Sequence, residues 1–169
     1  MWIVWSSSAS VYGDAVKDPM TEDHPFHNKN FYGATKICGE AMATAFSNRY
    51  GLKQVGLRYM NVYGPRQDYH GAYIVVIMKM LVGTGVRTSL KELAEKLVEL
   101  TGFKQPIQYQ ERSQATLVTN RVGCPKRAAE EIGFEAQTGL DEGLAKLIEW
   151  RTKHKAAVAA RRKAVGYVS

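Results

Sequence analysis

Tyr32 and Lys36 are the residues whose types and spacing best fit acid–base chemistry. They lie four positions apart in the run 32–36 (YGATK). On a helix, residues four apart share one face, with their Cβ atoms about 5–6 Å apart. A fixed ammonium beside a phenol favours the phenolate, which can then act as a general base. The same spacing also fits an amphipathic face on which Lys36 is only solvated, so the surrounding elements decide between the two readings.

Two strands and a helix are predicted around this pair. A short apolar run that meets small polar residues, 3–8 (IVWSSS), predicts the end of a buried strand. After a loop over 11–30, apolar residues at three- and four-residue spacing predict a helix over 31–50, which Gly51 ends. Residues 55–62 predict a second strand. Strand, helix, strand predicts a parallel pair with a right-handed crossover, the unit of a doubly wound α/β fold.

Two segments of the second half have helical patterns. The apolar segment 72–81 predicts a buried helix. Ser89 and Glu92 stand at the spacing of a capping box, in which each side chain satisfies a backbone amide of the first turn. A helix is therefore predicted from Ser89 to Gly102, with a buried stripe of Leu93, Leu97 and Leu100.

Three further elements are predicted towards the C-terminus. Residues 107–109 predict a short strand. Pro125 and Gly133 stand at the favoured start and stop positions of a short helix. Residues 140–150 predict another helix, with three inward residues, Leu144, Leu147 and Ile148.

Composition excludes two classes of protein. The chain has 169 residues, 45% of them hydrophobic and 23% charged, and this is too apolar for intrinsic disorder. No window contains the roughly 18–20 uninterrupted apolar residues that a membrane-spanning helix needs. The apolar start runs into serines rather than into a signal-peptide cleavage site. We therefore expect a cytoplasmic protein without a membrane partner.

The positive charge and the cysteines have ordinary explanations. Much of the formal net charge of +7 lies in the Ala-rich stretch 151–169, which fits a solvated helix or a frayed tail better than a nucleic-acid surface. Cys38 and Cys124 have no second cysteine or histidine at metal-ligand spacing. We expect no nucleic-acid partner and no metal site.

Two further motifs flank the Tyr32–Lys36 helix, in an order that is specific. They are 6–13 (SSSASVYG) and 57–66 (LRYMNVYGPR). With these motifs, the chain resembles the extended short-chain dehydrogenase/reductase family, in its NAD-dependent epimerase/dehydratase branch, and 6–13 resembles the nucleotide-sugar 4-epimerases. The resemblance runs from about Ile3 to Trp150. It implies the C-terminal part of a Rossmann-like doubly wound parallel sheet, with a smaller α/β substrate-binding domain.

The resemblance assigns roles to individual residues. It implies that Tyr32 is the catalytic base, that Lys36 is its partner and the anchor of the NAD ribose, and that Ser8 binds the reacting sugar oxygen. The cofactor-binding residues that it implies are Ser6, Tyr32, Lys36 and Tyr59. The substrate-binding residues that it implies are Ser8, Ser10 and Asn61.

The implied activity is that of an NAD-dependent nucleotide-sugar epimerase, acting on a UDP-hexose through a 4-keto intermediate. The 4,6-dehydratases of the family carry an Asp-Glu pair where this chain has Ala9-Ser10, which favours the epimerases. A dehydratase, decarboxylase or reductase of the same family is an alternative. A truncated, non-catalytic remnant that binds no cofactor is another.

The chain departs from the family pattern at two places. A Gly-rich turn for the NAD pyrophosphate is missing, because Gly83-Thr84-Gly85 is followed by Thr88 where a third glycine is needed. We expect about a hundred residues of the cofactor-binding half to be absent. We also expect an internal segment to be missing at the Leu81/Val82 junction.

Three parts and a homodimer are implied by the same resemblance. The parts are 1–65, which is the rest of the NAD-binding domain with the catalytic helix, 66–150, which is an incomplete substrate domain, and the basic tail 151–169. Dimers in the family pack this helix into a four-helix bundle. Four apolar positions fit such an interface but equally fit the chain's own sheet, namely Met42, Ala43, Ala45 and Phe46.

Overall fold

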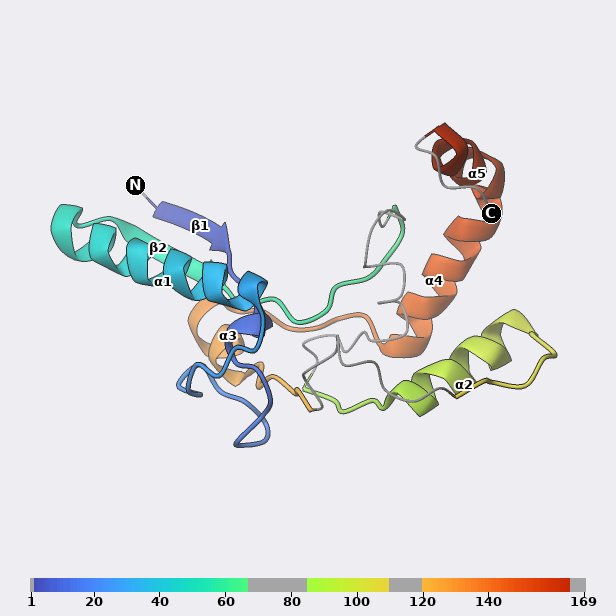
Figure 1. Ribbon diagram of the computed structural model, residues 1–169, viewed down its shortest axis with the longest axis horizontal. Helices are drawn as coiled ribbons and strands as arrows, with labels where there is room; N and C mark the ends of the chain where they lie inside the picture. Colours follow the sequence, from blue (N-terminus) through green and yellow to red (C-terminus); the bar gives the residue numbers. More distant parts are fainter. Residues whose placement is uncertain (1, 67–84, 110–119, 165–169) are drawn as a thin grey trace. The chain divides into compact units, whose positions relative to one another are not determined.

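The computed structural model describes residues 2–66, 85–109 and 120–164 (Figure 1). Their elements are β1 (Trp2–Ser6), the 3-10 helix η1 (Ala9–Val11), α1 (Phe31–Tyr50), β2 (Lys53–Leu57), α2 (Leu90–Thr101), α3 (Lys126–Ile132), α4 (Leu140–Lys153) and α5 (Lys155–Ala164). They belong to two compact units. The first contains the described residues up to 60, 85–86 and 120–135, and the second contains 61–66, 87–109 and 136–164. The three-part division at 65/66 and 150/151 stays a prediction.

β1 and β2 form the predicted parallel pair, and α1 is the crossover between them (Figure 1). Val4 lies opposite Val55 in the register of the two strands. The helix begins and ends as the sequence predicts. Asn30 caps it by accepting a bond from the amide of Gly33 at 2.7 Å, and Gly51 ends it at a φ of 64°.

Trp5 connects these three elements. The indole lies close to two glycines. A Cβ added to Gly56 of β2 would lie 2.9 Å from the ring, and a Cβ added to Gly39 of α1 would lie 3.5 Å from it. Its indole N–H donates to the side chain of Gln54 at 2.7 Å. The glycines let the ring lie close to the backbone of both the helix and the neighbouring strand.

The core of the first unit is formed by the segment that follows β1 in the chain. Its buried side chains come from η1 and the loop that follows, namely Ala9, Val11, Tyr12 and Met20. The same loop is fastened to a distant part of the chain, since the amide of Met20 donates to Val122 at 2.7 Å and that of Cys124 donates to Met20 at 2.8 Å. The loop over 11–30 is therefore ordered by tertiary contacts.

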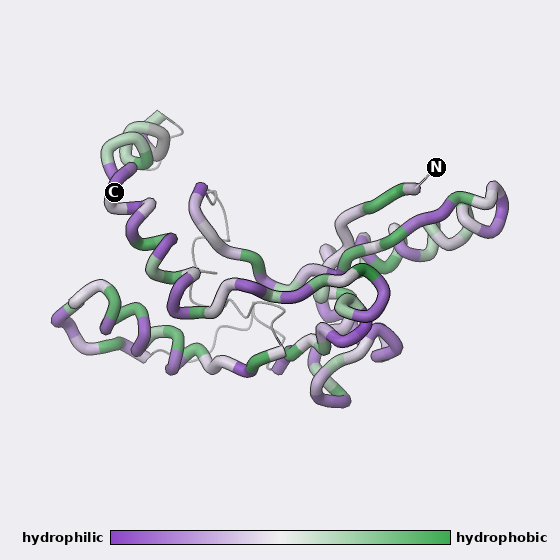
Figure 2. Tube along the Cα trace, turned by 180° about the vertical axis from the view of Figure 1, so that it is seen from behind, coloured by the Kyte–Doolittle hydropathy of each residue, from purple (hydrophilic) through white to green (hydrophobic). Residues whose placement is uncertain are grey.

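The second unit packs α2 against α4. Ser89 and Glu92 form the predicted capping box, with bonds of 2.6 Å and 3.1 Å. Leu93 of α2 and Leu144 of α4 are each 2% exposed, and an ion pair joins the two helices through Lys96 and Asp141. Figure 2 shows apolar and polar residues alternating along α4, as in an amphipathic helix. Gly133 ends α3 as predicted, whereas Pro125 stands at the N-cap, one residue before the first helical position.

Two predictions about the sheet are wrong. β1 is not buried, since Trp2 and Val4 are each 66% exposed, and Figure 2 shows this strand as an apolar stretch. Among the described residues, the sheet has two strands and α1 is the one α-helix packed against it, so much of its surface stays uncovered. β2 ends at Leu57 rather than at 62, because the amide of Tyr59 turns back to the carbonyl of Leu57 at 3.1 Å.

Two further predictions are wrong and two lie outside the described residues. Leu100 is 40% exposed, because it stands in the last turn of α2, just before the C-cap Gly102. Residues 107–109 form no strand, and Tyr109 is exposed. The predicted helix over 72–81 and the Leu81/Val82 junction fall in a segment that the structure does not describe. No helix within the described residues is long and apolar enough to cross a bilayer.

Candidate functional site

The structure brings Tyr32 and Lys36 together at the start of α1. The ammonium of Lys36 lies 5.5 Å from the centre of the Tyr32 ring, so both side chains share one face of the helix. It also donates to the carbonyl oxygen of Ser6, at the end of β1, at 2.9 Å. An ammonium has three N–H donors, so this bond leaves others for a phenolate or a ribose hydroxyl. Tyr32 is 47% exposed and can be reached by a ligand.

Ser8 lies in a turn that is held on both sides. The amides of its neighbours, Ser7 and Ala9, donate to the carbonyls of Leu57 at 2.9 Å and Tyr59 at 2.8 Å. Its own Oγ accepts a bond from the amide of Ser10 at 3.1 Å and caps η1. This bond uses an oxygen lone pair, so the Ser8 O–H can still donate to a substrate oxygen. The backbone therefore fixes the hydroxyl at the carboxyl end of β1.

Gly33 lets α1 begin close to this turn. A Cβ at this position would lie 2.6 Å from the carbonyl oxygen of Ser10, a distance that only glycine avoids. The first turn of α1, which carries Tyr32, thus lies directly against the Ser8–Ser10 turn. This role of Gly33 was not predicted, although a glycine directly after the tyrosine is a signal of close backbone approach.

Glu40 and Arg58 form an ion pair that the sequence analysis also missed. The guanidinium binds both carboxylate oxygens, Nε at 2.8 Å and Nη2 at 2.6 Å. Burial opposes ionisation of Glu40, but hydrogen bonds from Arg58 and Ser7, together with the charge of Arg58, lower its pKa below the usual value. Burial likewise disfavours the charged form of Arg58, yet its bonds to Glu40 and Tyr12 raise its pKa. The pair is therefore ionised at neutral pH.

The other predicted site residues differ in their placement. Ser6 contributes its backbone carbonyl, which accepts the bond from Lys36. Tyr59 contributes its carbonyl to the Ser8 turn, and its ring is 47% exposed. Asn61 is the first residue of the second unit and directly follows Met60, with which the first stretch of the first unit ends. The catalytic, cofactor-binding and substrate-binding roles all stay predictions.

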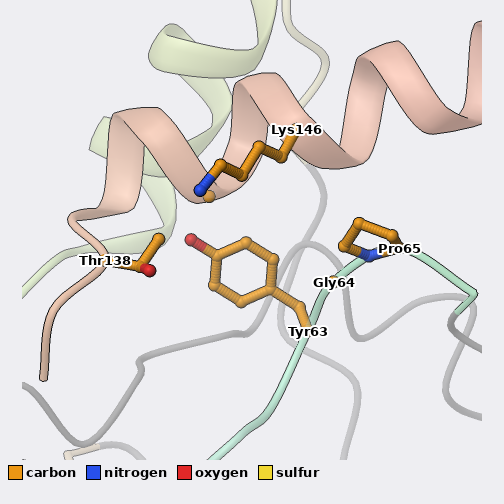
Figure 3. A pocket seen from close by; sticks show the side chains of 6 residues that line it. Tyr63, Gly64, Pro65, Thr138 and Lys146 are labelled. Carbon is orange, nitrogen blue, oxygen red and sulfur yellow. The ribbon is translucent and has the colours of Figure 1, made fainter.

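A pocket of about 250 Å³ lies in the second unit (Figure 3). It is lined by Tyr63, Gly64, Pro65, Thr138, Gly143 and Lys146. The Tyr63 hydroxyl donates to the carbonyl of Leu140 at 3.2 Å, and burial together with the negative charge of Asp141 raises its pKa. None of the predicted site residues lines this pocket. No group of three or more His, Cys, Asp or Glu side chains in the described parts of the chain could hold a metal ion.

Comparison with known proteins identifies the family. The family model described as "NAD dependent epimerase/dehydratase family" matches residues 2–97, which is more than half of the chain. The chain belongs to the NAD-dependent epimerase/dehydratase family. UDP-glucose 4-epimerase of Mycolicibacterium smegmatis is 29% identical over 86% of this chain and 60% of its own length. The chain thus spans about 60% of the length of that curated relative.

Two solved structures support the predicted α/β fold. UDP-glucose 4-epimerase of Thermotoga maritima, determined with UDP-glucose, matches with a TM-score of 0.76 and 25% identity, over 91% of this chain and 64% of its own. MoeE5 in complex with UDP-glucuronic acid and NAD matches with a TM-score of 0.78 and 28% identity, over 90% of this chain and 65% of its own. The predicted family and the Rossmann-like fold class are confirmed.

Proposed function

We propose that this chain is the catalytic part of an NAD-dependent nucleotide-sugar 4-epimerase that acts on a UDP-hexose through a 4-keto sugar. The observation that carries the proposal is the arrangement of Tyr32 and Lys36 on one face of α1, with Lys36 bonded to the end of β1 at 2.9 Å. Ligands of parallel α/β sheets bind at the carboxyl ends of the strands, where these side chains lie. UDP-hexose is the substrate class of the similar proteins named above.

The residues present fit the ribose and nicotinamide end of NAD. Lys36 supplies N–H donors for ribose hydroxyls, and the exposed Tyr32 hydroxyl lies at the same helix face. Tyr59 and Ser6 border the same strand ends and are the residues proposed nearest the nicotinamide. Bound NAD would accept a hydride from the sugar and later return it.

Acid–base chemistry falls to the residues of this chain. The Tyr32 phenolate takes the proton of the sugar 4-hydroxyl as the C4 hydride leaves, and the nearby Lys36 charge stabilises the phenolate. Ser8 donates its O–H to the same sugar oxygen and stabilises the ketone that forms. When the ketone is reduced on its other face, Tyr32 returns the proton. Ser10 and Asn61 are proposed to hold the sugar and the phosphates of the nucleotide.

The turn after β1 favours epimerisation over dehydration. Eliminating water needs an additional acid and base near the sugar. Positions 9 and 10 of this turn hold alanine and serine, so neither supplies a carboxylate. Ala9 is 1% exposed and belongs to the core, and the amide of Ser10 donates to the Ser8 hydroxyl oxygen. We also propose that the protein is a homodimer and that it works in the cytoplasm.

Tyr32→Phe tests the proposal directly. Removing one hydroxyl should lower the conversion of UDP-glucose to UDP-galactose by about 10²–10⁴-fold, the usual contribution of a general acid–base group. The amount of NAD released on denaturation reports separately whether the cofactor is still bound, and Tyr50→Phe, at the far end of the same helix, should keep full activity. Full activity in Tyr32→Phe would contradict the assigned base. A wild-type chain that neither releases NAD nor converts the sugar would contradict the function.

A further inference from the structure

Glu40 is the third member of a stripe along α1. Tyr32, Lys36 and Glu40 follow one another at intervals of four, so they lie on one helix face. Lys36 binds the carbonyl oxygen of Ser6 at 2.9 Å, and Glu40 accepts a bond from the Ser7 hydroxyl at 2.6 Å. Side chains from two successive turns of the helix are therefore hydrogen-bonded to the two residues that directly precede Ser8.

Arg58 connects this stripe to the end of β2 and to the loop after η1. Besides its two bonds to Glu40, its Nη1 donates to the Tyr12 hydroxyl at 2.9 Å and to the Glu22 carbonyl at 2.8 Å. Its guanidinium also lies 4.9 Å from the centre of the Tyr12 ring. Arg58 itself directly follows β2, the strand whose last residue accepts the bond from the Ser7 amide. One side chain thus joins the helix, the strand end and the loop after η1.

The ion pair is better suited to fixing geometry than to adding stability. The side chains of Arg58 and Glu40 are only 19% and 16% exposed. A pair taken this far out of water loses in desolvation much of what it gains in attraction. Its planar, two-bond geometry nevertheless fixes the carboxylate in one orientation. Because the same carboxylate accepts the Ser7 hydroxyl, that orientation is passed to the residue next to Ser8.

We propose that Glu40 and Arg58 are positioning residues that act through Ser7 to set the place of the Ser8 hydroxyl relative to Tyr32 and Lys36. The role in catalysis rests on the function proposed above. The structural link itself does not, because it consists of hydrogen bonds within the first unit. It goes beyond the assigned catalytic residues, since neither side chain is required to touch the substrate.

Ser7→Ala tests the link by removing its last bond while the ion pair is kept. Ser47→Ala is the matched control, because it also removes a 2.6 Å bond from a serine hydroxyl, to the carbonyl of Leu52 at the other end of α1. Amide hydrogen exchange, measured by NMR on the full chain, reports on the turn through three bonded amides, those of Ser7, Ala9 and Ser10. Their exchange should become about tenfold faster in Ser7→Ala and stay unchanged in Ser47→Ala.

Two outcomes would overturn the inference. One is an unchanged rate at these amides in Ser7→Ala. The other is an equal acceleration at every amide in both variants, which would show a general loss of stability rather than a local release. If Ser7→Ala does not fold, Arg58→Lys decides, since lysine keeps the charge but cannot form the two-bond fork. It should accelerate exchange at the same turn, and the absence of any local effect would reject the proposal.

Sugar conversion then separates positioning from function. In an active protein, Ser7→Ala should lower kcat by about tenfold with little change in KM for UDP-glucose, because a misplaced Ser8 affects the transition state more than binding. A raised KM with unchanged kcat would contradict positioning. If the wild-type chain has no activity, the proposed function fails, while the exchange measurements still decide whether Glu40 and Arg58 hold the turn.

Discussion

At the residue level, Glu40 shows how hydrogen bonds from neighbouring side chains keep a largely buried carboxylate ionised. Its carboxylate is enclosed by two donors from Arg58 and one from Ser7. Lys29 and Asp14 form the contrasting case, a 2.7 Å pair whose side chains are 44% and 26% exposed, and such a pair contributes little to stability. The difference lies in burial rather than in the ion-pair distance.

Glu40→Gln should show this in the pH dependence of stability. The pKa of Glu40 is lowered in the folded protein, so its stabilising contribution is complete above the unfolded value of 4.5 and is lost as the pH falls through the folded value. At pH 7 the variant should unfold with a free energy about 2 kcal/mol lower than the wild type. Urea unfolding between pH 7 and pH 3 should show the difference shrinking only below the unfolded pKa.

An exposed pair in the same unit provides the control for this measurement. Glu131 binds Arg127 at 2.7 Å on the surface of α3, with a side chain that is 60% exposed. Glu131→Gln should change the free energy of unfolding by less than about 1 kcal/mol at every pH. If the free energy of unfolding of Glu40→Gln followed the same pH dependence as this control, the buried pair would contribute no more to stability than the exposed one.

At the scale of elements, the sheet and α1 are joined through Trp5 rather than through a broad apolar face. The helix buries only Gly33, while Met42 and Phe46 are 56% and 48% exposed. Besides the polar bonds of Lys36 and Glu40, the indole therefore contacts glycines from both the helix and the neighbouring strand. This explains why a residue with no side chain stands at Gly56, in a strand where glycine is otherwise unfavourable.

Alanine at these two glycines should have opposite effects. In Gly39→Ala the new methyl meets the Trp5 ring at 3.5 Å, an ordinary contact, so the gain in helix propensity should stabilise the protein by about 0.5–1 kcal/mol. In Gly56→Ala the methyl would lie 2.9 Å from the ring, so Trp5 must move and the variant should be destabilised by about 1–3 kcal/mol. Urea unfolding followed by tryptophan fluorescence measures both. If alanine stabilised the protein at both positions, or destabilised it at both, the proposed role of Trp5 would be refuted.

At the scale of the whole molecule, apolar side chains remain at the surface of the strand and helix that carry the candidate site. Besides Trp2 and Val4 of β1, α1 presents Met42 and Phe46, which lie four residues apart on one face. Exposed apolar groups that share a face of a helix fit an interface better than isolated ones do. They support the proposal that two copies of the chain pair through α1.

Phe46→Glu should convert the proposed dimer into a monomer. Light scattering of the wild type at micromolar concentration should give twice the 18.9 kDa mass of the chain, and the variant should give the single mass, because a charge in the interface would lose its water. Phe103→Glu places the same charge at an exposed phenylalanine outside α1 and should leave the mass unchanged. A monomeric wild type would reject the dimer.

Features that depend on near neighbours along the chain were predictable from the amino-acid sequence. The limits of α1, its cap at Gly51, the capping box of Ser89 and the meeting of Tyr32 with Lys36 all follow from spacings of three or four residues along one helix. These geometries are set by the backbone and do not depend on the rest of the fold. The parallel order of β1 and β2 followed because a helix between two strands permits few connections.

Contacts between segments far apart in the chain could not be predicted in this way, because they depend on how the chain packs. Arg58 is as well suited to solvent as to an ion pair, and its choice of Glu40 depends on the packing of α1 against β2. The same holds for Gly33, whose role appears only beside Ser10, and for β1, whose apolar residues predicted burial that two strands do not provide. The type of a side chain determines which groups it can bind. Which partner the side chain meets depends on the packing of the whole chain.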